Sequence, residues 1–187
     1  MSFLNDLPEQ DKELIISLPY RVGVWISHSD DVGGEEADEN EKTALNNILA
    51  GFTQDVFGSE VVQFVMAETV SHKESWESWS KRTNKDEISK DCSHAIEILK
   101  RYVDEKEVSA FKQRLYEIAE AVALAFREYE ELDFSSRMRI YIIYLKEKWK
   151  AMQKRQSFKS FDQFQNISIK ERQALSFLSD TLGIDYS

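Results

Sequence analysis

The residues best suited to chemistry lie in one acidic stretch, residues 28–41, with the sequence HSDDVGGEEADENE. It holds seven carboxylates, no Lys or Arg, and two adjacent glycines. Hard divalent cations such as Ca²⁺ take about six to eight oxygen ligands, and clustered carboxylates supply several of them. Paired glycines let the backbone fold back, so that carbonyl oxygens also point inward. The stretch is therefore a candidate metal site, with the following ligands: Asp30, Asp31, Glu35, Asp38 and Glu41.

The spacing of these residues differs from that of an EF-hand. With Asp30 at position 1, Glu41 falls at position 12 as required. However, Val32 and Gly34 occupy positions that need side-chain ligands, and Glu35 stands where the turn needs glycine. A solvated turn is the alternative, because acidic residues at a helix N-terminus are favourable without any metal. Both interpretations stay open on these residues alone.

No catalytic constellation accompanies the acidic stretch. The sequence contains no nucleophile elbow, phosphate loop or dinucleotide fingerprint. Cys92 and His94 are two potential zinc ligands, but no second Cys/His pair at a matching spacing completes a four-ligand site. We expect Cys92 to be buried on the apolar face of its helix. Di-metal carboxylate enzymes need Glu-x-x-His pairs. The residues three positions before the three histidines are Trp25, Thr69 and Asp91, so none of them is the required glutamate. The sequence predicts a protein that is not an enzyme.

The composition fits one globular domain over residues 1–187, with 42 % apolar residues for a core. No apolar run approaches the roughly 20 residues of a membrane span. The N-terminus lacks the basic and apolar regions of a secretory signal, and a single cysteine excludes an internal disulfide. These features predict a cytoplasmic location.

Charge is distributed unevenly along the chain, whose net charge is −10. Residues 137–172 hold ten Lys or Arg and three Asp or Glu, in contrast to the acidic stretch. A sequence pI near 4.9 argues against a nucleic-acid binder, which presents a dominant basic face. The basic segment is either a solvated helix face or a surface for an acidic protein partner.

Proline and capping residues mark the boundaries of several predicted helices. The residue pattern predicts a short helix over 9–17 and a new helix that begins near Pro19, where proline's missing N–H costs nothing. Asp38 and Glu41 have the spacing of a capping box that opens the next helix, which ends near Phe57. Ser59 is then placed to cap the helix that follows.

The cleanest periodicity runs from Val108 to Leu132, with apolar residues at alternating spacings of three and four. This seam is either buried within the monomer or shared in a self-associated form. Further helices are predicted around 138–152 and after Ser168, with Gly183 at the C-terminal cap. The three phenylalanines of 156–167 fit one more turn. The sequence thus predicts an all-α, single helical-bundle domain of about seven to eight helices.

Two segments share a layout. An apolar helix leads into the acidic D-x-G loop of residues 29–35, and E-x-x-x-L follows at Glu41 and Leu45. Near the C-terminus, residues 167–175 read I-S-x-x-E-x-x-x-L, and residues 182–184 read L-G-I. This order of parts resembles the tellurite-resistance TerB-like family, whose members are helical bundles with acidic loops.

The resemblance implies a stress-associated helical protein that binds a divalent cation. It matches Asp30, Asp31 and Glu41 to the acidic positions of the first family motif, and Glu171 to the helix-start glutamate of the second. The chain departs from the family in two ways: the first loop carries an extra acidic insertion, and the second keeps only Asp162. A cation site would therefore rest on the first loop alone.

Overall fold

The computed structural model describes residues 3–30, 35–54, 59–125 and 169–184. The side chains of Asp30, residues 35–41 and Ile169 lie outside this description. Every regular element among the described residues is helical, which confirms the all-α class. The helices expected over 138–152 and 156–167 fall outside the described residues, so their prediction stays untested.

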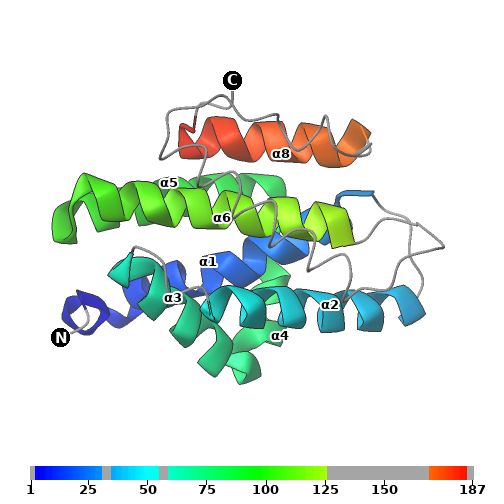
Figure 1. Ribbon diagram of the computed structural model, residues 1–187, viewed down its shortest axis with the longest axis horizontal. Coiled ribbons are helices and arrows are strands. Elements are labelled where there is room, and N and C mark those ends of the chain that lie inside the picture. Colours follow the sequence, from blue (N-terminus) through cyan, green and yellow to red (C-terminus); the bar gives the residue numbers. More distant parts are fainter. Residues whose placement is uncertain (1–2, 31–34, 55–58, 126–168, 185–187) are drawn as a thin grey trace.

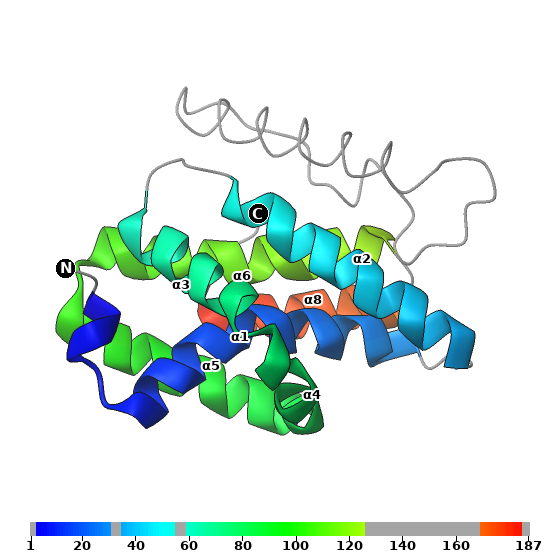
Figure 2. The same ribbon diagram turned by 90° about the horizontal axis from the view of Figure 1, so that it is seen from below.

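The bundle is organised around α1 (Glu9–Ser27), which packs against each of the other α-helices that the structure describes. Figures 1 and 2 show α1 running through the middle of the molecule. Those helices are α2 (Glu35–Thr53), α3 (Glu60–Ser71), α4 (Trp76–Trp79), α5 (Lys85–Tyr102), α6 (Glu105–Ala125) and α8 (Ile169–Leu182). Short 3₁₀ turns complete the described elements: η1 (Phe3–Asp6), η2 (His28–Asp30), η3 (Lys73–Ser75) and η4 (Ser80–Arg82).

The apolar seam predicted from Val108 onward is buried along α6. Phe111, Leu115, Ile118 and Val122 are at most 1 % exposed, as the alternating spacing requires for one continuous face. α6 packs against α1, α2, α3, α5 and α8, and the described part of the seam belongs to the core of this chain. Its last predicted turn, after Ala125, lies outside the described residues.

The expectation that a new helix begins near Pro19 is wrong, because α1 continues through that position. A proline inside a helix removes a backbone hydrogen bond and crowds the preceding turn. Ile15, Leu18 and Val22 surround Pro19 and are fully buried, so core packing on both sides of the proline opposes a break. Thr69 Oγ1 also donates a hydrogen bond of 2.6 Å to a carbonyl of the same turn, that of residue 16.

The start of α2 also differs from the prediction. The helix begins at Glu35, so Asp38 lies inside its first turns and is not the N-cap. The capping-box spacing of Asp38 and Glu41 was therefore misleading. Carboxylates near the positive end of the helix dipole favour helix at 35–41, which explains why these acidic residues belong to α2 and not to the loop.

Two predicted caps are confirmed. Ser59 Oγ accepts the N–H of Val62 at 3.1 Å and donates to Glu107 Oε2 at 2.6 Å, which ties the start of α3 to α6. Gly183 ends α8 with φ = +59°, a left-handed conformation that glycine adopts without a Cβ penalty. Ser168, the proposed cap of α8, lies outside the described residues.

The two tryptophans of the polar 71–84 stretch hold it on the core, as their shared spacing suggested. Trp76 stacks on Tyr20 with ring centroids 4.5 Å apart, and Trp79 is 4 % exposed. Trp79 Nε1 donates to Glu13 Oε1 at 3.2 Å. These contacts fix α4 and η4 against α1.

None of the described helices combines the length and apolar character that a membrane crossing needs.

Candidate functional site

The five predicted cation ligands lie along the connection from α1 to α2. Asp30 ends η2, Asp31 falls outside the described residues, and Glu35, Asp38 and Glu41 occupy the first two turns of α2. Their spacing of three makes successive members neighbours on the helix surface. The structure therefore places four of the five on two helical elements, at the end of η2 and the start of α2, although it does not describe their side chains.

The turn that enters this segment is anchored to the bundle. η2 packs against both α1 and α8. Just before it, the Trp25 ring meets Phe177 of α8 edge-on, with centroids 5.9 Å apart. Within this turn, Ser29 Oγ is buried and has no hydrogen-bond partner among the residues that the structure describes. Buried hydroxyls normally have a partner, so this oxygen next to Asp30 is an unfilled polar position.

The described side chains outside this segment do not form a metal centre. No group of three or more His, Cys, Asp or Glu residues with suitable geometry occurs among them. Cys92 is fully buried, as predicted, and burial raises the pKa of its thiol to about 12. His94, two residues later, is exposed, so the two do not share an environment. Cys92 is therefore suited to packing and not to nucleophilic attack or metal ligation.

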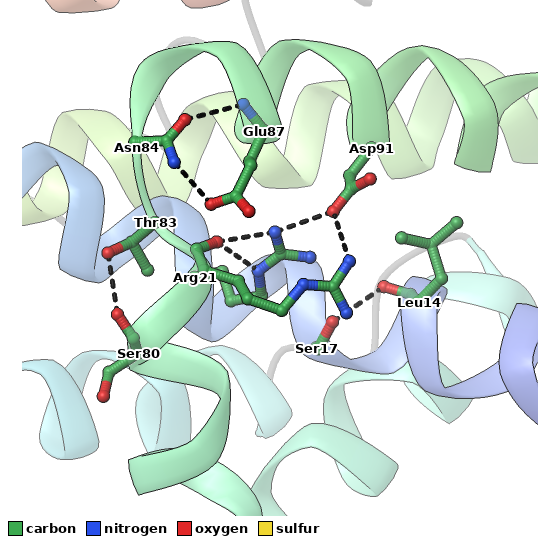
Figure 3. Close-up of polar contacts among 9 residues, drawn as sticks. Leu14, Ser17, Arg21, Ser80, Thr83, Asn84, Glu87 and Asp91 are labelled. Atoms are coloured by element: carbon green, nitrogen blue, oxygen red, sulfur yellow. Dashed lines mark hydrogen bonds and ion pairs between the residues drawn. The ribbon is translucent and has the colours of Figure 1, made fainter.

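A polar site that the sequence analysis did not predict lies between α1 and α5. Figure 3 shows the Arg21 side chain reaching from α1 toward η4 and α5. Arg21 Nε and Nη2 donate to the Arg82 carbonyl at 2.8 and 2.6 Å, and Nη2 lies 2.7 Å from Asp91 Oδ2. The Arg82 guanidinium approaches the same carboxylate oxygen at 3.4 Å. One carboxylate thus lies between two guanidinium groups.

The two guanidinium groups differ sharply in exposure. The Arg21 side chain is 2 % exposed, whereas that of Arg82 is 61 % exposed. Arg21 is therefore a fixed part of the interior, and Arg82 is an outer group with one long contact to Asp91. Both line a groove of about 640 Å³ on the surface between α1 and α5, which Trp79 also borders.

The local backbone around the groove is set by a helix cap. Asn84 Oδ1 accepts the N–H of Glu87 at 3.0 Å, and Asn84 Nδ2 donates to Glu87 Oε2 at 2.6 Å. Thr83 Oγ1 donates to the Ser80 carbonyl at 2.9 Å, which closes the preceding turn (Figure 3). These bonds end η4 and start α5, so the Arg82 carbonyl is held facing Arg21.

A sequence signal for this site existed. Arg21 is the only charged residue in the apolar run from Leu14 to Ile26, and a buried arginine needs a partner. The identity of that partner depends on how α1 packs on α5, which no local pattern states.

The residues of the second family motif are only partly described. Glu171 lies in the first turn of α8 and is 5 % exposed. Residues 156–168, including Asp162, are outside the described part of the chain.

No protein-family model, no curated protein and no solved structure matches this chain. The likeness to TerB-like proteins accordingly remains a prediction based on short motifs.

Proposed function

We propose that the protein is a non-enzymatic, TerB-like helical domain that binds a divalent cation such as Ca²⁺ between η2 and the start of α2. Its ligands would come from the following residues: Asp30, Asp31, Glu35, Asp38 and Glu41. The link to stress or tellurite resistance rests on the resemblance alone.

The observation that carries this proposal is the position of the helix start at Glu35. Because α2 begins there, only residues 31–34 separate η2 from the helix, and two of these are glycines. A connection of four residues limits how far the end of η2 can lie from the first turn of α2. Clustered oxygen ligands of this type suit a hard cation.

A second feature of the same turn agrees with a cation site. The buried Ser29 Oγ has no hydrogen-bond partner in the described structure and lies beside Asp30 in sequence. A bound cation, or a water in its coordination shell, would give this oxygen a partner. The exclusion of Cys92 from solvent makes its thiol unsuited to nucleophilic catalysis.

The competing explanation is that the carboxylates only stabilise the N-terminus of α2 through the helix dipole. A calorimetric titration of chelator-treated protein with CaCl₂ separates the two. We expect saturable binding that is lost in the double variant Asp30→Asn with Asp31→Asn. The control double variant, Glu74→Gln with Glu77→Gln, removes the same charge from exposed positions and should bind as the original protein does. Equal binding by both variants would place the cation elsewhere.

A metal-free protein–protein interaction module is the second candidate, and the groove between α1 and α5 favours it. The groove is lined by charged side chains of both signs, as expected for a surface that binds a polar partner. Retention of a bound partner should then fall as salt rises. Retention that is equal at low and high salt would count against this candidate.

A further inference from the structure

The groove between α1 and α5 has opposite charges at its two ends. Figures 1 and 2 show the two helices running in opposite directions, so the start of α1 lies near the end of α5. Asp11 and Glu97 line the groove at that end, and Glu13 follows on α1. Arg82 and Lys90 line it at the other end, where Arg21 meets Asp91.

The basic end retains positive charge after its internal pairing. Among the residues that line this end of the groove, Arg21, Arg82 and Lys90 are cationic, and the carboxylate of Asp91 lies between the first two. Within the described part of the chain, the exposed guanidinium of Arg82 is held by one contact of 3.4 Å, which a stronger acceptor can replace.

The distance between the ends indicates the size of an occupant. Asp11 and Arg21 are ten residues apart on α1, which corresponds to about 15 Å along a helix axis. An extended chain rises about 3.3 Å per residue, so about four to five residues span this length. The groove volume, about 640 Å³, is compatible with a segment of this size.

We propose that this groove binds an extended segment of a partner protein that carries a carboxylate and, about five residues away, a basic side chain. The carboxylate lies at the exposed guanidinium of Arg82, whose planar geometry favours a carboxylate. The basic side chain lies between Asp11 and Glu97. The buried Arg21 does not contact the partner; it pairs with Asp91, which the Arg82 guanidinium also contacts.

The groove and the proposed cation site are built from different residues. The groove residues belong to α1, α4, η4 and α5, whereas the proposed cation ligands belong to η2, α2 and the residues between them. Loss of cation binding in the double aspartate variant should therefore leave the groove able to bind peptide. Failure of one proposal does not imply failure of the other.

The test uses the full chain and two capped six-residue peptides. The first has Glu at one end, Lys at the other and Ser or Ala between them; in the second, Gln replaces both charged residues. Binding is followed by NMR through the indole N–H of Trp79, which borders the groove. We expect saturable shifts with the charged peptide and none with the neutral one. No shift at millimolar charged peptide would overturn the proposal.

Matched variants distinguish the site from general electrostatic attraction. Arg82→Gln keeps the backbone carbonyl that holds Arg21 but removes the outer guanidinium, and should weaken peptide binding about tenfold. Lys81→Gln removes the same charge from the neighbouring exposed residue, which does not line the groove, and should bind within about twofold of the original. Equal weakening by both variants would overturn the proposal. If Arg82→Gln fails to fold, Lys90→Gln takes its place, with weaker binding expected.

Discussion

Arg21 and Asp91 form a buried ion pair, with Nη2 and Oδ2 2.7 Å apart, that joins α1 to α5. The Arg21 guanidinium is further fixed by two hydrogen bonds to the Arg82 carbonyl. A charge that is removed from water in this way is tolerated because it is paired and hydrogen-bonded. The pair therefore sets how the two helices meet and forms the base of the groove between them.

Replacement of Asp91 by Asn should destabilise the fold by about 3 kcal/mol, because it leaves the buried Arg21 charge without its carboxylate. Urea unfolding followed by circular dichroism measures the change. Asp86→Asn is the matched control on the exposed first turn of α5, and should cost less than about 1 kcal/mol. A loss below about 1 kcal/mol for Asp91→Asn would show that the pair contributes little to stability.

Cys92 should make stability depend on alkaline pH. Burial raises the pKa of its thiol from the ordinary value of 9.0 to about 12. Between these values the unfolded chain releases the proton and the folded chain keeps it, so the free energy of unfolding falls as pH rises through this window. Below it, both states are protonated and the effect vanishes. Unfolding titrations of the protein and of Cys92→Ala measure the difference, and parallel pH profiles for the two would contradict this account.

Cys92 should also resist thiol reagents while the protein is folded. Its side chain is fully buried, and the thiolate that reacts is disfavoured at neutral pH. We expect reaction with a disulfide reagent to be slow in buffer and fast in urea. Fast labelling without denaturant would indicate that α5 opens readily.

Gly23 permits the close approach of α1 to α2. A Cβ at this position would overlap the Leu45 side chain. Overpacking of this kind costs about 1–3 kcal/mol, which outweighs the gain of up to about 1 kcal/mol from replacing glycine in a helix. Gly23→Ala should therefore lower stability in thermal unfolding. In a Leu45→Ala background the same change should cost less, and equal costs in both backgrounds would rule out the clash.

Local signals in the sequence predicted much of the helical structure. Ser59 and Gly183 were identified as caps because capping depends on residue type and immediate neighbours. The burial of Cys92 and of the Phe111 face followed from helical periodicity. These features need no knowledge of the distant chain.

The errors and omissions involve packing between distant segments. Proline's preference for the first turn predicts a helix start at Pro19, but burial on both sides keeps α1 continuous through it. The capping-box spacing predicts a cap at Asp38, but the same spacing also occurs inside a helix. The pairing of Arg21 with Asp91 requires the packing of α1 on α5, so the groove was not predicted. The cation site is a sequence prediction that the described side chains leave untested.

The most direct test of the proposed function is a thermal melt of chelator-treated protein, repeated with millimolar Ca²⁺, Mg²⁺, Mn²⁺ or Zn²⁺. A cation at about 100 times its dissociation constant adds about 2.7 kcal/mol, which raises Tm by about 5–10 °C in a chain of this size. We predict such a rise with one cation, and its loss in the variant Asp30→Asn with Asp31→Asn. No rise with any cation, or an undiminished rise in that variant, would contradict a site at residues 30–41.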